Sequence, residues 1–207
     1  PGAARATARL ATPVAARGAA RVVAIGTSTG GPAALRRVLG ELPRELPVPV
    51  LVVQHMAHGF IDGLASWLGA TARLPVRVAV DGAPLAPGGV LVAPDDRHLT
   101  VSPEGRVRLT DELPVGGFRP SADVLFESCA RVYGAGVVAL VLTGMGRDGV
   151  DGLAHVHAAG GRVLAQDELS SVVYGMAQEA VRAGVVHEVH ALDALARRVV
   201  ELTDPDA

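Results

Sequence analysis

Short apolar runs alternate with helix-like segments along most of this chain, and that alternation constrains the fold more than any other feature. Strand-like runs occupy residues 21–26, 49–54, 76–80, 89–93, 99–102, 106–110, 137–143 and 162–166. Helical patterns occupy residues 32–41, 60–72, 121–133, 149–159, 175–183 and 191–202. Strands that alternate with helices predict an α/β fold with a mostly parallel sheet.

The segment from 76 to 110 departs from this alternation, because its short apolar runs have no helical pattern between them. Within it, the stretch "VSPEGRVRL" at 101–109 is typical of a β-hairpin. We therefore expect this region to be antiparallel or to lie at an edge of the sheet.

Composition narrows the class of protein further. Hydrophobic residues make up 49% of the 207 residues and aromatic residues only 3%, so the core is built from Val, Leu and Ala, as in buried parallel strands. The net charge of −2 argues against nucleic-acid binding. No apolar run reaches the roughly 18 residues that span a bilayer. The single cysteine, Cys129, forbids an internal disulfide and fits a reducing, cytoplasmic compartment.

All 19 basic residues are arginine, and the chain contains no lysine. This excludes a Schiff-base lysine, a P-loop lysine and a Ser–Lys dyad from the chain.

Residues 1–20 differ in composition from the rest. They are rich in Ala, Pro and Gly, and Pro13 and Gly18 would break an amphipathic helix. The chain also starts at Pro1 rather than Met. We expect a linker remnant or disordered N-terminal segment at 1–20, from a longer polypeptide, and one domain at 21–203.

Polar residues follow five of the predicted strands where each strand ends. These strand ends read "GTSTGG", "QHM", "APDDRH", "GMGRDG" and "DELSS". In open α/β sheets, ligands bind beyond the carboxyl ends of the strands. The pattern therefore predicts a functional site at that edge.

The glycine-rich turn after the first strand does not fit a phosphate-binding loop. A Walker A loop needs Gly-Lys-Ser/Thr, but Gly31 is followed by Pro32. The dinucleotide fingerprint needs glycine where Ser28 stands and an acid at the end of the next strand, which instead ends in Gln54 and His55.

Residues 26–30, Gly-Thr-Ser-Thr-Gly, do match the G-x-S-x-G pattern of a serine nucleophile held on a sharp strand-to-helix turn. Backbone N–H groups at the start of the following helix would face an oxyanion there. The alternative is a plain glycine turn in which Ser or Thr caps the helix.

A serine nucleophile needs a base and a group that orients the base. His55 follows the neighbouring strand, and Asp148 lies in a glycine loop after a very apolar strand. Asp148 has an alternative role as the N-cap of the helix at 149–159. The order Ser, His, Asp differs from that of α/β-hydrolases, but triads are recognised by geometry. The competing acids and histidines are Asp95, Asp96, Asp167, His58, His98, His187 and His190.

Six blocks in this order and spacing resemble the catalytic domain of the chemotaxis receptor methylesterase family, CheB. They are "IGTSTGGP", "VVQHM", "VLVAPDDRHL", "RPSADVLF", "LTGMGRDG" and "AQDELSSVVYGMA". The resemblance covers roughly residues 21–202 and is far more specific than G-x-S-x-G alone.

The resemblance implies a doubly wound, three-layer α/β/α fold and a Ser-His-Asp triad. By position, the nucleophile falls on Ser28, the general base on His55 and the orienting acid on Asp148, with oxyanion contacts from Thr29 and the Met145 backbone. It implies hydrolysis of glutamate methyl esters on the cytoplasmic helical region of methyl-accepting chemotaxis receptors, and deamidation of receptor glutamines. The best-known members of the family also carry an N-terminal receiver domain, and no segment of this sequence resembles one. Two alternatives remain open: a fragment whose partner receiver domain lies outside the sequence, or a stand-alone version of the enzyme.

Some positions depart from the family pattern. Ala57 and His58 replace the usual proline after "QHM", and Ala177 replaces the proline after "YGM". Leu169 and Ser171 stand where small residues and Cys are common. None belongs to the triad, so they bear on loop shape and receptor preference.

Other candidates have structural explanations. The helical spacing around Cys129 predicts burial. His155 and His157 lie two apart on one predicted helix and cannot share a metal, and no acid cluster joins His187 and His190. We therefore predict no metal and no cofactor.

Four further residues are candidates for other roles. Asp95 and His98 are candidates for substrate contact, Arg119 for contact with an acidic partner surface, and Ser121 for the cap of its helix.

Two other functions remain open from the sequence. One is a general carboxylesterase or amidase that acts on small substrates. The other is a non-catalytic adaptor that binds receptors or nucleotides through the same glycine turn.

Overall fold

The protein is described by a computed structural model, which describes residues 21–204. Its centre is a seven-stranded sheet in the order β3-β4-β2-β1-β7-β8-β9, and every pair of neighbouring strands is parallel. The strands are β1 (Val22–Thr27), β2 (Val50–Gln54), β3 (Val76–Val78), β4 (Val90–Val92), β7 (Val137–Val141), β8 (Arg162–Gln166) and β9 (Glu188–His190).

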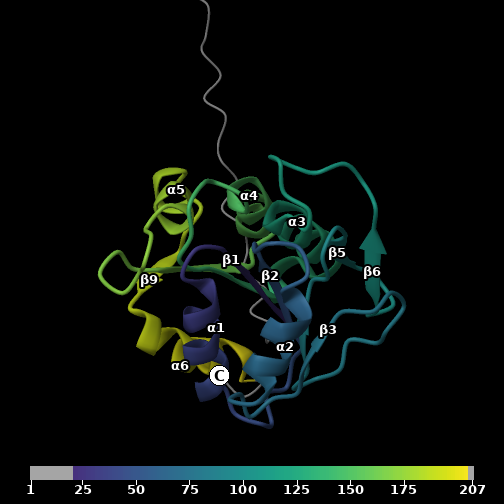
Figure 1. Ribbon diagram of the computed structural model, residues 1–207. Helices are drawn as coiled ribbons and strands as arrows, with labels where there is room; N and C mark the ends of the chain where they lie inside the picture. Colours follow the sequence, from purple (N-terminus) through teal and green to yellow (C-terminus); the bar gives the residue numbers. More distant parts are fainter. Residues whose placement is uncertain (1–20, 205–207) are drawn as a thin grey trace, which may run out of the picture.

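Helices cover both faces of this sheet (Figure 1). One face packs against α1 (Gly31–Glu41), α2 (Ile61–Gly69) and α6 (Leu192–Thr203), and the other against α3 (Ala122–Tyr133), α4 (Val150–Ala158) and α5 (Met176–Arg182). Strands β1, β2 and β7 are buried along their whole length, because helices shield both of their faces. The three-layer, doubly wound α/β/α fold is the one predicted.

The order of the strands reverses at β1. The chain first builds the half of the sheet on one side of β1: β2 lies beside β1, β3 forms the edge, and β4 fills the place between them. It then crosses back to place β7 on the other side of β1. At such a switch point the connections after the two adjacent strands diverge to opposite faces and leave a crevice at the carboxyl ends. The turn after β1 and the loop after β7 therefore border one crevice.

The region from 76 to 110 only partly follows the prediction. Strands β5 (His98–Val101) and β6 (Val107–Thr110) form the expected antiparallel hairpin, but as a separate two-stranded sheet. The hairpin packs on α3, where the Val101 N–H donates to Ser128 Oγ at 3.2 Å. Strand β3 is an edge strand but pairs with β4 in parallel, joined to it by a loop instead of a helix.

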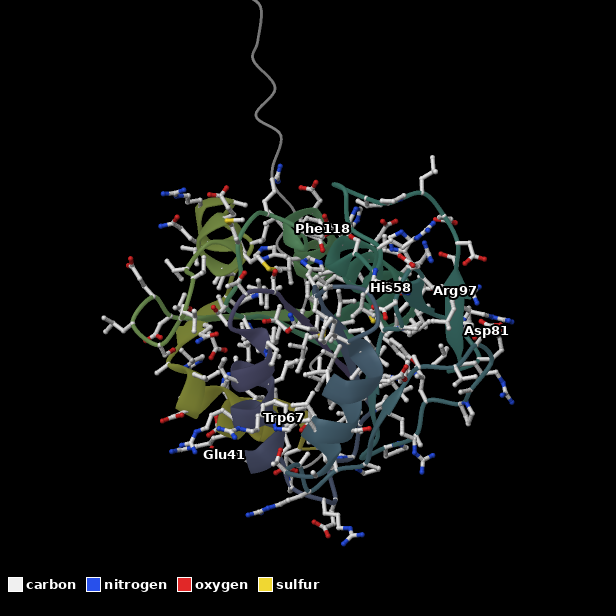
Figure 2. All side chains as sticks on the ribbon, viewed as in Figure 1. Glu41, His58, Trp67, Asp81, Arg97 and Phe118 are labelled. Carbon is white, nitrogen blue, oxygen red and sulfur yellow. The ribbon has the colours of Figure 1, made fainter. Side chains whose placement is uncertain are left out.

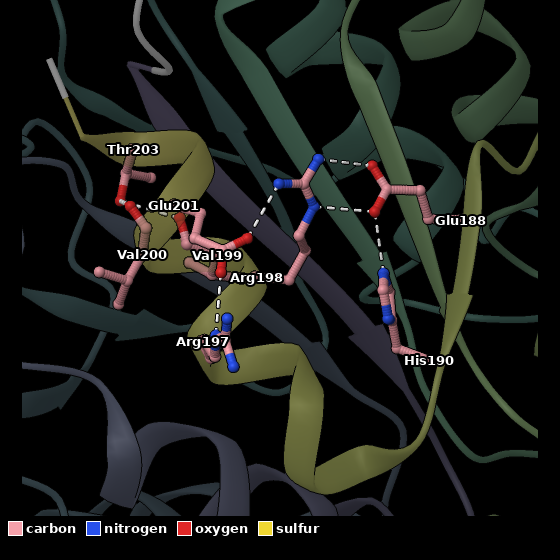
Figure 3. A network of polar contacts seen from close by, with 8 residues as sticks. All are labelled: Glu188, His190, Arg197, Arg198, Val199, Val200, Glu201 and Thr203. Carbon is pink, nitrogen blue, oxygen red and sulfur yellow. Dashed lines mark hydrogen bonds and ion pairs between the residues drawn. The ribbon is translucent and has the colours of Figure 1, made fainter. Parts of the chain in front are cut away.

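Each predicted helix is present, but strand β9 was not predicted. It is three residues long, alternates polar and apolar side chains, and pairs with β8 alone among the described strands. A polar network ties it to α6: Arg198 donates two hydrogen bonds to Glu188 at 2.8 Å each, and His190 Nε2 lies 2.9 Å from the same carboxylate (Figure 3). A short 3₁₀ helix, η1 (Gly134–Gly136), precedes β7.

The segment at 1–20, predicted to be a linker, lies outside the described residues. Within residues 21–204, none of the helices has the length and apolar character needed to cross a bilayer.

Candidate active site

Ser28 follows β1 in a tight turn that only glycine allows at two positions. The Gly31 N–H donates to the Ser28 carbonyl at 2.8 Å, and Gly30 adopts a φ of 83°. A Cβ on Gly30 would lie 2.6 Å from Val172, and one on Gly31 would lie 1.9 Å from Gln54 Oε1. The glycine turn therefore presents a half-buried serine at the start of α1.

His55 occupies the matching place on the neighbouring strand. The register pairs Thr27 with Gln54, so Ser28 and His55 are the next residues on two adjacent parallel strands. The Gln54 side-chain amide joins them, because its Nε2 donates to the carbonyls of Ser28 at 2.8 Å and His55 at 2.7 Å. A fully buried amide thus fixes the backbone of both residues relative to each other.

The His55 ring is held on two sides. Its Nε2 lies 2.8 Å from Asp148 Oδ2, and the Phe118 ring stacks on it at 4.1 Å between centroids and 9° between planes. A carboxylate only accepts hydrogen bonds, so Nε2 carries the proton and Nδ1 presents the lone pair of the neutral ring. Nδ1 is buried and has no partner among the described residues, which leaves it free to accept a proton.

Asp148 is almost fully buried, with 2% of its side chain exposed. Burial alone would raise the pKa of Asp148, but hydrogen bonds from His55, Ser121 and the Ala122 N–H outweigh it and hold that pKa below its usual range. The carboxylate is therefore charged next to the imidazole. The alternative role as cap of α4 is wrong, because Gly149 is the N-cap and, among the described residues, Asp148 accepts no N–H from that helix. Asp148 instead bonds the first N–H groups of α3.

The two predicted oxyanion residues border the same crevice. The loop after β7 passes so close to the Ser28 turn that a Cβ on Gly144 would lie 2.8 Å from Ser28 Cβ. The Ser28 N–H donates to the Thr143 carbonyl at 3.0 Å, which ties the two loops together. Within residues 21–204, the backbone N–H groups of Thr29 and Met145 donate to no backbone carbonyl. Both groups remain available to a ligand.

A cavity of about 340 Å³ opens beside His55, between the loops that follow β2, β4 and β6. His58 and Phe118, both labelled in Figure 2, belong to its wall. Two carboxylates tie the loops together: Asp95 accepts the Gly59 N–H at 2.8 Å, and Asp96 pairs with His58 at 3.0 Å. The His58 side chain is 75% exposed, so the cavity is open to solvent.

The other candidates from the sequence lie in different places. Asp95 lines the cavity, and its contact with substrate stays a prediction, whereas the prediction that His98 touches substrate is wrong, because His98 is fully buried. Arg119 also lines the cavity and donates to the backbone carbonyls of Asp111 and Glu112. Cys129 is buried, and burial raises the pKa of its thiol to about 12, so the thiol is unreactive.

The competing histidines and acids are engaged elsewhere. His187 stacks on His157 at 4.5 Å and accepts the Val163 N–H, and burial lowers the pKa of His187. His190 contacts Glu188. Asp167 accepts hydrogen bonds from Ser170 in the loop after β8. Of the four acids considered, only Asp148 meets His55.

Sequence reasoning missed three contributors to the site: Gln54, Phe118 and the contact from Ser121 to Asp148. Phe118 is one of only three phenylalanines and stands in a Gly-Gly-Phe-Arg-Pro loop without apolar periodicity, which was a usable signal. Ser121 occupies the N-cap position of α3 as predicted, but its side chain does not cap that helix.

Comparison with known proteins gives matches to one family. A family model described as CheB methylesterase matches residues 23–199. Protein-glutamate methylesterase/protein-glutamine glutaminase 4 of Myxococcus xanthus is 59% identical over 178 residues, which cover 86% of this chain and 50% of that protein. Protein-glutamate methylesterase FrzG of Myxococcus xanthus is 44% identical over 88% of this chain and 55% of its own length.

Among solved structures, the Thermotoga maritima CheB methylesterase catalytic domain superposes with a TM-score of 0.87 at 35% identity. The match covers 88% of this chain and 98% of that structure. The chain spans about half the length of the curated relatives it matches.

Proposed function

Because this chain belongs to the CheB methylesterase family, we propose that it hydrolyses methyl esters of glutamate side chains on methyl-accepting chemotaxis receptors. The observation that carries the proposal is the buried contact between His55 and Asp148, 2.8 Å long, next to the Ser28 turn. It leaves one imidazole nitrogen free on the strand beside the serine, as a general base requires.

In the proposed mechanism, His55 Nδ1 removes the proton from Ser28 Oγ as that oxygen attacks the ester carbonyl. Asp148 keeps the proton on Nε2 and stabilises the imidazolium that forms. The backbone N–H groups of Thr29 and Met145 stabilise the oxyanion, each by about 3 kcal/mol.

The tetrahedral intermediate then collapses. The imidazolium returns its proton to the departing methoxide oxygen, methanol leaves, and a glutamyl ester of Ser28 remains. Water, deprotonated by His55, attacks this acyl-enzyme, and the proton passes back to Ser28 as the free glutamate is released. Glutamine deamidation follows the same steps with ammonia as the leaving group, so we propose it as a second activity of the site.

The proposal assigns residues 21–203 to one catalytic domain and residues 1–20 to a linker. The substrate is the cytoplasmic helical region of the receptors, so the protein acts in the cytoplasm, without nucleic acid and without inserting into the membrane. A receiver domain N-terminal to this chain is its expected regulatory partner.

The decisive experiment measures methanol release from a methylated receptor cytoplasmic fragment by this chain and by Ser28→Ala. We expect release that disappears in the variant. The matched control is Ser128→Ala, a buried serine outside the site that should keep full activity. Equal release by the chain and by Ser28→Ala would move the nucleophile to another residue.

Two further measurements separate the alternatives. Turnover of small esters without a receptor requirement would favour a general carboxylesterase or amidase. A serine-directed phosphonate probe that fails to label Ser28 would favour a non-catalytic adaptor.

A further inference from the structure

The Asp148 carboxylate has a partner outside the proposed triad. Ser121 Oγ donates to Asp148 Oδ1 at 2.5 Å, a length typical of a hydroxyl bonded to an ionised carboxylate. Ser121 is fully buried, so water does not compete for this contact. Both oxygens of Asp148 are thus engaged: His55 and the Ala122 N–H share Oδ2, and Ser121 holds Oδ1.

Ser121 gives up a local hydrogen bond to make this contact. An N-cap serine ordinarily accepts an N–H from the first turn of its own helix. Here the Ser121 side chain does not cap α3, and Asp148 receives the N–H groups of Ala122 and Asp123 at 2.6 and 3.4 Å instead. Such departures from local preference concentrate at functional sites.

A second buried residue orients Ser121. The Ser121 N–H donates to His98 Nδ1 at 3.2 Å, so that nitrogen is unprotonated and the proton of the neutral ring is on Nε2. His98 Nε2 lies 3.2 Å from the Leu113 carbonyl, which accepts that proton in a hydrogen bond. His98 is therefore fixed in one tautomer between strand β5 and the loop before α3.

The charged groups around Asp148 show why its charge depends on a neutral donor such as the Ser121 hydroxyl. His55 faces it from the end of β2, and Asp123 faces it from α3 as a second carboxylate, whose pKa is raised first by burial and also by Asp148 itself. Arg147, the preceding residue, pairs with Asp151 at 2.9 Å and not with Asp148. Among the described residues, neutral hydrogen-bond donors therefore carry much of the stabilisation of the Asp148 charge.

We propose that Ser121 is a positioning residue: its hydroxyl, oriented by His98, holds Asp148 ionised and aimed at His55 Nε2. This inference rests on the proposed roles of Ser28, His55 and Asp148. It adds two residues to the machinery of the site and makes a chain from His98 through Ser121 and Asp148 to His55.

The test measures how fast a fluorophosphonate labels Ser28, because this reaction needs the activated serine but not the natural substrate. We expect Ser121→Ala to lower the maximal inactivation rate about tenfold while the probe's KI stays unchanged. Removal of the donor leaves more negative charge on Asp148, so the pKa of Asp148 rises. The His–Asp pair titrates as a unit, so the acid limb of the pH–rate profile moves to higher pH.

Ser128→Ala is the matched control. Ser128 lies on the same helix and is also buried, and its hydroxyl bonds the Val101 N–H and the Leu125 carbonyl, away from the site. The control should retain the parent rate and the parent acid limb. If Ser121→Ala and Ser128→Ala have the same rate and the same acid limb, Ser121 is only structural and the proposal is wrong.

A pair of variants at His98 keeps the test decisive if Ser121→Ala does not fold. In His98→Asn the side-chain amide oxygen takes the place of Nδ1 as acceptor for the Ser121 N–H, whereas His98→Leu removes the acceptor. We expect the Asn variant to label faster than the Leu variant, and equal labelling would overturn the role of His98.

The outcomes also distinguish this inference from the proposed function. If the parent chain is labelled at Ser28 but releases no methanol, the receptor substrate is wrong while the role of Ser121 is still tested. If Ser28 in the parent chain is not labelled, the nucleophile assignment fails, and the positioning role fails with it.

Discussion

Two histidine–carboxylate contacts of nearly equal length lie in different parts of this molecule. His55 Nε2 is 2.8 Å from Asp148, and His190 Nε2 is 2.9 Å from Glu188. The first pair has 8% and 2% of its side chains exposed, and the second has 28% and 26%. The distance alone therefore does not separate a candidate catalytic pair from a structural one.

What differs is the use of the carboxylate. Glu188 also receives two hydrogen bonds from Arg198, so its charge is neutralised in a network that ties β9 to α6 (Figure 3). Among residues 21–204, Asp148 receives only neutral donors besides His55, and Phe118 covers the imidazole. The charge of Asp148 therefore has no cationic partner among these contacts except a protonated His55. It is available to stabilise the imidazolium that forms when His55 acts as a general base.

The largest effect should come from Asp148→Asn. The amide presents a donor or an acceptor to Nε2 with equal ease, so the correct tautomer is no longer enforced and activity should fall about 10³- to 10⁴-fold. Methanol release and phosphonate labelling both measure this. The matched change, Glu188→Gln, should leave the activity at the parent level, and a comparable loss there would end the distinction between the two pairs.

Phe118→Ala removes the ring that stacks on His55. Within the part of the chain that the structure describes, His190 has no stacked ring of this kind. We expect kcat to fall about tenfold, because the imidazole gains water contacts and orientational freedom. The unfolding free energy should change little, since Phe118 lies in a loop at the cavity. Phe118→His, which keeps a flat ring, should restore most of the rate, and an unchanged kcat in Phe118→Ala would show that the stack has no positioning role.

Glu188→Gln should cost about 1 kcal/mol of stability at pH 7, because it breaks a partly exposed, two-pronged contact with Arg198. The Arg198 hydrogen bonds, opposed by partial burial, lower the pKa of Glu188 to about 2. A carboxylate with a depressed pKa stabilises the fold above its unfolded pKa and loses this contribution as the pH falls toward the folded value.

The contribution of the Glu188 charge to the difference in unfolding free energy between the parent chain and Glu188→Gln should therefore be fully present above about pH 5. It should shrink as the pH falls from the ordinary glutamate range toward 2. Urea denaturation at a series of pH values measures it. A difference that does not vary with pH would show that the network contributes through packing and not through charge.

The smallest effect should come from Arg197→Ala on the same helix. Arg197 contacts Glu201 at 2.9 Å, but 85% of its side chain is exposed. An exposed pair of this kind contributes little to stability, because water screens it, so we expect no measurable loss. A larger loss in the same denaturation series would mean that the network in Figure 3 acts cooperatively through Glu201.

The sequence predicted the layers of the fold because helical and strand periodicities are local properties. It missed β9, since Glu188 and His190 are polar and a three-residue edge strand is defined by its pairing with β8. The prediction for the 76–110 region was also partly wrong, because β4 is a parallel strand inside the main sheet. A loop without a helix is enough to return the chain in parallel from β3 to β4.

For the site, the sequence alone selected Ser28, His55 and Asp148 as residues that follow buried strands, and the resemblance assigned their roles. Whether Asp95, Asp96, Asp148 or Asp167 meets His55 was decided only by tertiary structure, because the partners lie 93 residues apart and their loops must be placed by packing. The same holds for the free nitrogen of His55, the cover by Phe118 and the contact between Ser121 and Asp148. Residue type and strand order are written along the chain, whereas hydrogen-bond partners depend on how separate loops meet at one edge of the sheet.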